Sequence, residues 1–236
     1  MSILYLIRHA QASFGQENYD CLSNLGQQQA TILAGHFQNL GLEFDAVYSG
    51  SQVRHEQTAD ACRDNADTAE NQFPAVIKMD AFNEYDSENI LKTLIPEMIR
   101  EEPAFESEVA AMMQDKRSFQ QVYEKIMRRW VNSKQPIEQL ETWKSYSHRV
   151  TAGLQKIMTA EGSKKKVAVF TSGGPISVCV QKALNLSDDH TLQITWQIMN
   201  ASVTRLKYSG NRLMLFGFND VTHLELQKDA QLLTHR

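Results

Sequence analysis

Short apolar runs alternate along the chain with stretches in which apolar residues recur at helical spacing. Three runs, residues 3–7, 45–49 and 167–171, have the length and the flanking turn signals of buried strands. Between the first two, residues 26–40 are predicted to form a helix, because apolar residues recur at helical spacing from Ala30 to Phe37 and Gly41 follows as a stop signal. This order predicts a βαβ unit. The same alternation over the chain predicts an α/β fold, a three-layer sandwich with a mostly parallel central sheet and helices on both faces.

The remaining patterns outside the middle of the chain fit the same fold. Helices are expected at about 52–65 and 175–184, because each stretch begins just past a predicted strand. Two later runs, 203–208 and 213–218, are separated by Ser-Gly-Asn and predict a hairpin.

The middle of the chain, from about Ser87 to Ala160, has almost no glycine and no strand pattern. It predicts a helical insertion over the carboxyl edge of the sheet. Its aromatic residues Phe119, Tyr123 and Trp130 are expected to pack against the sheet or within the insertion. Because no linker or repeat interrupts the chain, residues 1–236 are expected to form a single domain.

Composition and charge exclude several classes of protein. The 236 residues carry 24 Lys+Arg and 28 Asp+Glu, a net charge of −4, and a nucleic-acid partner is not expected because phosphate backbones bind clustered basic surfaces. The three cysteines lie far apart without a C-x-x-C pair, which is typical of reduced thiols. The first apolar run is too short for a signal peptide or a membrane span. A cytoplasmic protein without a membrane partner is therefore expected.

The end of the first predicted strand is the first candidate site. Arg8 and His9 stop the apolar run abruptly, so their side chains are expected at the carboxyl edge of the sheet, where open α/β sheets bind ligands. Taken alone, such a pair also fits an ordinary surface edge.

Two further motifs follow this pair. The chain reads R-H-A at 8–10, L-S-N-L-G-Q-Q-Q-A at 22–30 and R-H-E-Q-T-A at 54–59. In this order, the motifs resemble the R-H-G/A, L-[ST]-x-x-G-x-x-Q-A and R-A-x-Q-T-A patterns of the histidine phosphatase superfamily, the phosphoglycerate-mutase-like proteins. The resemblance extends more loosely to Glu84 and to later segments near 173 and 200–224.

The resemblance implies a set of roles that suits phosphoryl transfer, which depends mainly on positioning and electrostatics. His9 is expected to be the nucleophile and to form a phosphohistidine, while Arg8 and Arg54 bind the phosphate. Glu84 is the candidate proton donor and base. Asp86 and Glu88 lie close enough to compete for that role, and all three acidic residues also fit an exposed loop. No metal or cofactor is expected, because no metal-ligand signature occurs.

Ser172 is the main departure from the family pattern. Family members carry a second histidine in S-H-G-G, whereas this chain reads Thr-Ser-Gly-Gly at 171–174. Ser172 and Gly173 are still expected to bind phosphate, the glycine through its backbone N–H. A neutral hydrogen bond contributes about 0.5–1.5 kcal/mol and a charge-assisted one about 1.5–3 kcal/mol, so the exchange predicts a rate loss on the order of tenfold to a hundredfold. Ser172→His is expected to raise hydrolysis or leave it unchanged.

Other histidines are candidates for the missing imidazole. His55 stands where the family usually has alanine, and His223 follows a predicted strand end; the sequence does not decide between them. Gly50, where the family often has serine, is a smaller departure. The other histidines are expected to be ordinary surface or satisfied residues: His36, His148, His190 and His235.

The function expected from these observations is phosphomonoester hydrolysis through His9. Glycerate mutases add an E-R-x-Y-G-like segment that N-E-Y-D-S at 83–87 does not supply, which favours a phosphatase over a mutase. The alternative of another class is a catalytically silent phosphate- or partner-binding protein, because of Ser172. The substrate, a small phosphorylated compound or a phosphoprotein, and the oligomeric state are left open.

Overall fold

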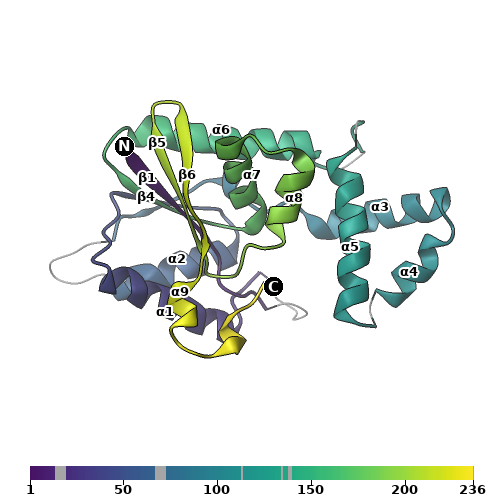
Figure 1. Ribbon diagram of the computed structural model, residues 1–236, viewed down its shortest axis with the longest axis horizontal. Coiled ribbons are helices and arrows are strands. Elements are labelled where there is room, and N and C mark those ends of the chain that lie inside the picture. The colour runs from purple at the N-terminus through teal and green to yellow at the C-terminus, as the bar shows by residue number, and fades with distance from the viewer. Residues whose placement is uncertain (14–19, 67–72, 113, 134, 138–139, 236) are drawn as a thin grey trace.

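A six-stranded sheet in the order β3-β2-β4-β1-β5-β6 forms the centre of the molecule (Figure 1). The computed structural model describes residues 1–13, 20–66, 73–112, 114–133, 135–137 and 140–235. The first four strands of that order are mutually parallel. β5 pairs antiparallel with both of its neighbours, β1 and β6. This confirms the predicted α/β fold with a mostly parallel sheet. The strands are β1 (Ser2–Arg8), β2 (Ala46–Ser49), β3 (Val76–Lys78), β4 (Lys166–Thr171), β5 (Val203–Ser209) and β6 (Arg212–Asp220).

The predicted βαβ unit is present, but its two strands are not neighbours. β4 lies between β1 and β2, so that Val167 pairs with Leu4 on one side and with Ala46 on the other. This order places the carboxyl ends of β1 and β4 side by side, and His9 N–H donates to the carbonyl of Thr171 (2.8 Å). Motifs that are more than 160 residues apart in sequence therefore meet at one edge of the sheet.

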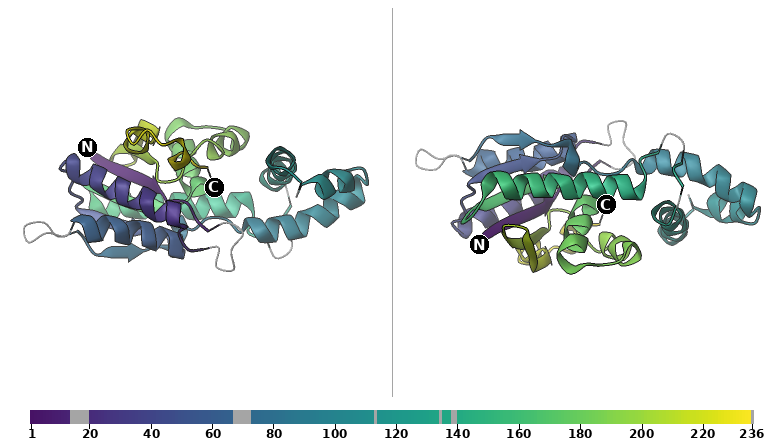
Figure 2. Two further views of the ribbon diagram at one scale, coloured as in Figure 1. Left: turned by 90° about the horizontal axis from the view of Figure 1, so that it is seen from below. Right: turned by 90° about the horizontal axis from the view of Figure 1, so that it is seen from above.

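Each face of the sheet packs against its own pair of helices (Figure 2). Because side chains alternate along a strand, Leu4, Leu6 and Val169 pack in one core with α6 (Trp143–Glu161) and α7 (Gly173–Leu184). Ile7 and Phe170 pack in the other core with α1 (Asn24–Asn39) and α2 (Val53–Ala66). The result is the expected sandwich of helices, sheet and helices.

Three helices project from the sandwich on one side (Figures 1 and 2). They are α3 (Ser87–Glu101), α4 (Phe105–Ala111) and α5 (Lys116–Val131). The stretch predicted as an insertion thus divides into this projecting part and α6, which covers the sheet. Trp130 of α5 joins the two parts, because its ring contacts Tyr85, Trp143 and Tyr146.

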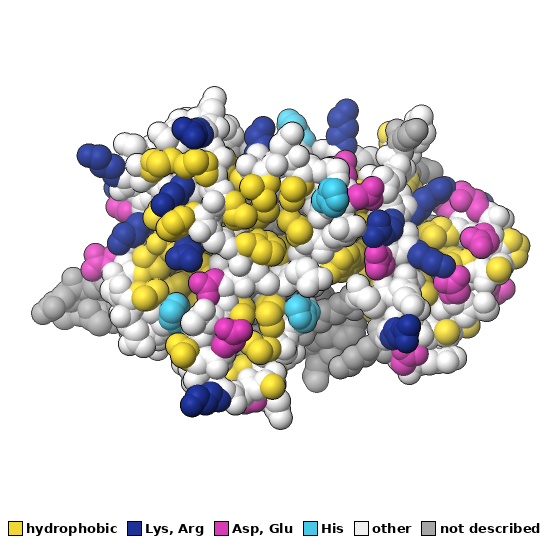
Figure 3. Space-filling model, in the orientation of Figure 1, with side chains coloured by type: hydrophobic (Ala, Val, Ile, Leu, Met, Phe, Trp, Pro, Cys, Tyr) yellow, Lys and Arg dark blue, Asp and Glu magenta, His cyan; other side chains and the backbone are white. Residues whose placement is uncertain are grey.

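The surface of the projecting helices carries interleaved acidic and basic side chains (Figure 3). Arg128 pairs with Glu124 (2.8 Å) and Arg129 with Glu101 (2.6 Å). Exposed pairs of this kind stabilise a fold by about 0–1 kcal/mol each, so they mark a solvated face and not a binding patch.

Several short elements have no clear signal in the sequence. β3 has only three residues, too few to show a strand period. The short helix α8 (Asp188–Thr195) precedes the hairpin of β5 and β6, and the short helix α9 (Thr222–Glu225) follows it. Within the described residues, no helix is both long and apolar enough to span a bilayer. The three cysteines are unpaired, and Cys62 and Cys179 are buried.

Candidate active site

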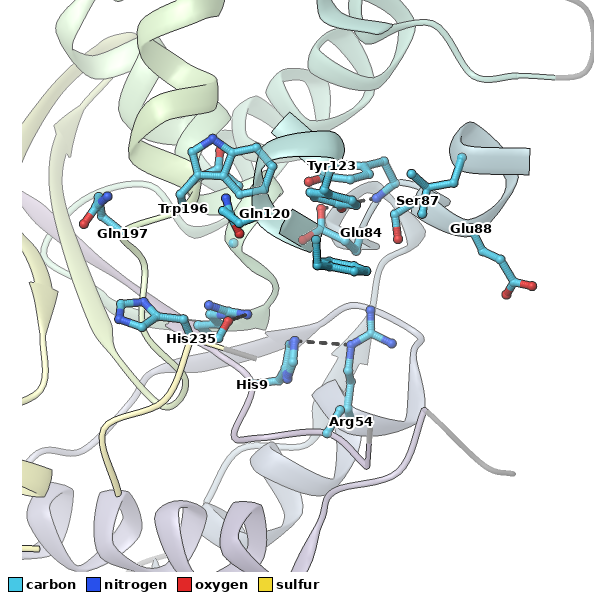
Figure 4. Close-up of a pocket in the computed structure, with 17 residues that line it drawn as sticks. His9, Arg54, Glu84, Ser87, Glu88, Gln120, Tyr123, Trp196, Gln197 and His235 are labelled. Atoms are coloured by element: carbon cyan, nitrogen blue, oxygen red, sulfur yellow. Dashed lines mark hydrogen bonds between the residues drawn. The ribbon is translucent and has the colours of Figure 1, made fainter. Parts of the chain in front are cut away.

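A cavity of about 830 Å³ opens at the carboxyl edge of the sheet, beneath the projecting helices (Figure 4). Five of the residues expected in the site line it: Arg8, His9, Arg54, Glu84 and Gly173. The sheet edge and the amino ends of α2 and α7 supply these groups, while α3, α5 and the segment after α8 supply the opposite wall. The tertiary structure therefore brings together side chains that the sequence only orders along the chain.

His9 has a defined tautomer. Its Nδ1 lies 2.7 Å from the carbonyl of Ala10, which only accepts, so Nδ1 carries the proton. Its Nε2 accepts a hydrogen bond from Nε of Arg54 (3.3 Å) and therefore has a lone pair. Burial, followed by the positive charges of Arg54 and Arg8, lowers the pKa of His9 well below 6.5. His9 is thus a neutral imidazole whose Nε2 lone pair lies at the floor of the cavity.

Two side chains, Asp20 and Gln52, hold Arg54 beside His9. One terminal nitrogen forms an ion pair with Asp20, and the other donates to the side-chain oxygen of Gln52 (2.8 Å). Asp20 also accepts from the backbone N–H of Val53 (2.8 Å) at the start of α2. Sequence reasoning did not identify Asp20 or Gln52; the position of Gln52 two residues before Arg54 was the only available signal.

Arg8 also lines the cavity. One terminal nitrogen donates to the carbonyl of Ile198 and the other to that of His235 (2.7 Å). These two bonds orient the guanidinium group of Arg8 at the cavity.

The other motif residues build the loop that carries His9. Ser23 caps α1 by accepting from Gly26 N–H (3.0 Å), and a Cβ at Gly26 would lie 2.0 Å from the carbonyl of Gln11. Gln29 accepts from the N–H of Gln11 (2.8 Å). Thr58 accepts from the N–H of Ala10 (3.1 Å) and donates to the carbonyl of Arg54 (2.7 Å), which ties the two halves of the site together. These residues position the site without lining it.

Glu84 projects into the cavity from the segment after β3, and three donors hold its carboxylate. The hydroxyl of Tyr146 (3.0 Å) and the N–H of Tyr85 (3.2 Å) donate to Oε1, and the N–H of Gly174 (3.0 Å) donates to Oε2. Burial, followed by the charge of Glu84, raises the pKa of Tyr146 well above 10.0, so its hydroxyl keeps the proton that it donates. Tyr146 was not identified from the sequence, because it belongs to none of the motifs.

The competing acidic residues differ from Glu84 in their contacts. Asp86 caps α3 by accepting from Asn89 N–H (3.0 Å), and it does not line the cavity. Glu88 lies on the cavity rim but pairs with Lys92 (2.5 Å). In Figure 4, Glu84 lies nearer to His9 and Arg54 than Glu88, whose carboxylate projects away from them.

Ser172 differs from the other expected phosphate-binding residues, because it does not line the cavity. Its side chain is 1% exposed, and its Oγ lies 2.6 Å from Nε2 of His55. The His55 ring is itself fully buried, with its centroid 5.6 Å from that of His9. Direct contact between Ser172 and a phosphate stays a prediction.

The three departures from the family pattern form one contact cluster. A Cβ at Gly50 would lie only 2.3 Å from Nδ1 of His55, so this glycine makes room for the imidazole. Burial, followed by the charge of Arg54, lowers the pKa of His55 well below 6.5 and keeps the ring neutral. Gly50, His55 and Ser172 therefore place a second imidazole behind His9, although not in the cavity itself.

The other histidine candidates also have definite positions. His223 stacks on His36 of α1, with ring centroids 5.2 Å apart, and does not line the cavity. His235, expected to be an ordinary surface residue, is exposed but lines the cavity. No local signal marks it, because only the fold returns the end of the chain to Arg8.

The aromatic stripe of the projecting helices divides between core and cavity. Trp130 is buried in the core, as predicted. Phe119 and Tyr123 also pack on the core, as predicted, and in addition they line the cavity. Within the described part of the chain, no group of three or more His, Cys, Asp or Glu side chains is placed to hold a metal ion.

A comparison with protein-family models identifies the family of this chain. The model of the histidine phosphatase superfamily (branch 1) matches residues 4–128 and 108–221. A search of curated proteins found no match.

Solved structures with a similar fold have low sequence identity. A mutant phosphoserine phosphatase from Entamoeba histolytica in complex with phosphoserine is 17% identical, with a TM-score of 0.63 over 95% of this chain and 100% of that chain. A phosphoglycerate mutase from Bacillus anthracis is 17% identical, with a TM-score of 0.61 over 97% of both chains. A mycobacterial glucosyl-3-phosphoglycerate phosphatase in complex with inorganic phosphate is 17% identical, with a TM-score of 0.63 over 94% and 98%. At this identity the likeness establishes the fold.

Proposed function

The chain belongs to the histidine phosphatase superfamily, and we propose that it hydrolyses phosphomonoesters through a phosphohistidine intermediate on His9. One observation carries the proposal: His9 is neutral, with the proton on Nδ1 and the lone pair of Nε2 at the floor of the cavity beside Arg54. An imidazole in this state is a nucleophile at neutral pH.

In the first step, Nε2 of His9 attacks phosphorus and the bond to the ester oxygen breaks. Arg8, Arg54 and the N–H of Gly173 lie around the same floor and stabilise the charge on the phosphoryl oxygens. The carboxyl group of Glu84 gives its proton to the leaving oxygen, so the alcohol departs neutral. Nδ1–H remains bonded to the Ala10 carbonyl and stabilises the phosphorylated ring.

In the second step, a water molecule attacks phosphorus and the P–N bond breaks. The Glu84 carboxylate takes a proton from this water, which regenerates the acid for the next cycle and releases inorganic phosphate. The three donors on Glu84 support this role, because they hold one carboxyl group in place for both proton transfers. The scheme needs no metal ion or cofactor.

Hydrolysis is preferred over a mutase reaction. The segment N-E-Y-D-S at 83–87 lacks the E-R-x-Y-G pattern expected of glycerate mutases. Two of the similar structures bear the names of phosphatases and one that of a mutase, so the neighbours allow both activities. We propose a small phosphorylated compound as the substrate and the cytoplasm as the location.

The test is hydrolysis of an aryl phosphate by the wild type, by His9→Ala and by Glu84→Gln, with and without a chelator. We expect slow turnover that the chelator does not change and that His9→Ala abolishes. A rapid quench in base should trap the phosphate on the wild type, since phosphohistidine is stable in base and labile in acid. Turnover that persists in His9→Ala would overturn the proposal.

A catalytically silent phosphate-binding protein is the second candidate, because a serine stands at position 172 and its hydroxyl is turned toward His55. This candidate predicts that vanadate binds to the wild type and less tightly to Arg54→Ala, with no turnover above that of His9→Ala.

A further inference from the structure

The cavity has two chemically different halves. Its floor is charged and holds His9, Arg8 and Arg54, whereas aromatic and amide side chains form the wall on the opposite side (Figure 4). A volume of about 830 Å³ lies in the range of cavities that enclose a drug-sized ligand. A phosphoryl group on the floor leaves most of this space to the group that carries the phosphate.

Three rings form a continuous strip along the wall. Phe119 and Tyr123, one helical turn apart on α5, are stacked with centroids 5.7 Å apart and an interplanar angle of 15°. Tyr123 meets Trp196 edge to face, with centroids 5.3 Å apart. All three are partly exposed and line the cavity, so a ligand in the cavity can contact the strip. An aromatic ligand gains free energy from such rings beyond the area that it buries.

The charges on the wall oppose a second anionic group. Among the described lining residues, Arg8 and Arg54 are the only Lys or Arg side chains, and both lie at the floor. The charged side chain on the rim is Glu88, which Lys92 neutralises in part. A carboxylate or second phosphate on the leaving group would find no described Lys or Arg side chain on the wall to pair with.

We propose that the substrate carries a single phosphate on a bulky, uncharged aromatic leaving group, which stacks on the strip of Phe119, Tyr123 and Trp196. The inference rests on the proposed function, because it takes the floor as the site of the phosphoryl group. A substrate of this class differs from phosphorylated carboxylic acids and bisphosphates, whose second anionic group needs a further cation in the binding site.

Binding of phosphonates tests the proposal without turnover, because their P–C bond is not hydrolysed. Calorimetry would compare naphthylethyl, propyl and carboxyethyl phosphonate on the full chain. We expect the naphthylethyl compound to bind at least about tenfold more tightly than the carboxyethyl compound, a ratio that corresponds to about 1.4 kcal/mol. The matching phosphate esters, all of primary alcohols, should follow the same order in kcat/KM.

A charge placed on the wall should change this preference. Gln120 lines the cavity on α5, whereas its neighbour Gln121 is exposed and does not. Gln120→Arg should increase affinity for the carboxyethyl compound several-fold relative to the naphthylethyl compound. Gln121→Arg adds the same charge to the same helix outside the cavity and should leave the ratio unchanged.

Truncation of the strip supplies the converse test. Phe119→Ala should weaken naphthylethyl binding about fivefold to tenfold and leave propyl phosphonate unchanged, while Phe216→Ala removes an exposed ring on β6 as a control. Equal binding of all three phosphonates, or tighter binding of the carboxyethyl compound, would overturn the substrate class while leaving the phosphoryl site intact. If no phosphonate binds, the phosphoryl site fails and both proposals fail with it.

Discussion

Ser172→His is the variant for which the structure reverses the expectation from the sequence. The sequence alone predicts that an imidazole at this position raises hydrolysis or leaves it unchanged. In the structure, Oγ of Ser172 lies 2.6 Å from Nε2 of His55, and both side chains are buried. A histidine at 172 has a ring carbon where this oxygen now lies, far inside the usual contact distance of about 3.5 Å. The single variant is therefore expected to lose stability and activity.

The magnitude follows from two effects. Forcing extra atoms into a packed interior costs about 1–3 kcal/mol, and leaving the buried His55 ring without its partner costs about 1–3 kcal/mol. We expect Ser172→His to lower the free energy of unfolding by about 2–6 kcal/mol. His55→Ala removes the obstructing ring, so in the double variant the new imidazole occupies the vacated space and faces the cavity floor.

Urea unfolding of the wild type, both single variants and the double variant forms a double-mutant cycle. We expect a favourable coupling free energy of about 2 kcal/mol or more, because the two changes share one space. Hydrolysis should fall in Ser172→His and return in the double variant to at least the level of His55→Ala. Changes in stability that add within about 0.5 kcal/mol would refute the assignment of His55 and Ser172 to one packed unit.

Three further predictions concern charge and proton position. Burial lowers the pKa of His223 to about 4, so between about pH 6.5 and pH 4 the unfolded chain binds a proton on this residue that the folded chain does not bind. The free energy of unfolding should therefore fall by about 2 kcal/mol between about pH 7.5 and pH 5. Urea unfolding of His223→Gln should show a loss that is smaller by this amount. Because the pKa of His9 also lies well below 6.5, protonation of His9 should not lower kcat/KM near pH 6.5. If kcat/KM does decline near pH 6.5, and the midpoint of this decline moves in Arg54→Gln, the neutral state of His9 is contradicted. Tyr146→Phe removes one donor to Glu84 while keeping the buried ring, so steady-state kinetics should show kcat about tenfold lower with KM nearly constant, and an unchanged kcat would exclude a positioning role.

Much of the fold could be predicted from the sequence, because strand and helix patterns are local. The apolar run 3–7 and the charged pair that follows it predict β1 and the location of Arg8 and His9 at its end. The hairpin follows from two apolar runs around Gly210, which adopts a positive φ of 55°. The motif residues Ser23 and Thr58 act on their own helices and on the nearby His9 loop, within about fifty residues of sequence.

Only the tertiary structure decided which distant side chains meet. The insertion of β4 between β1 and β2 brings Ser172 to His55, and it places the N–H of Gly174 on Glu84. The return of the chain end to Arg8 likewise places His235 at the cavity. The hydrophobic period along a strand determines which face is buried, but strand order depends on the packing of the whole sheet. For this reason the sequence by itself determined which residues are candidates for the site, whereas the sheet order and the docked helices determined what surrounds them.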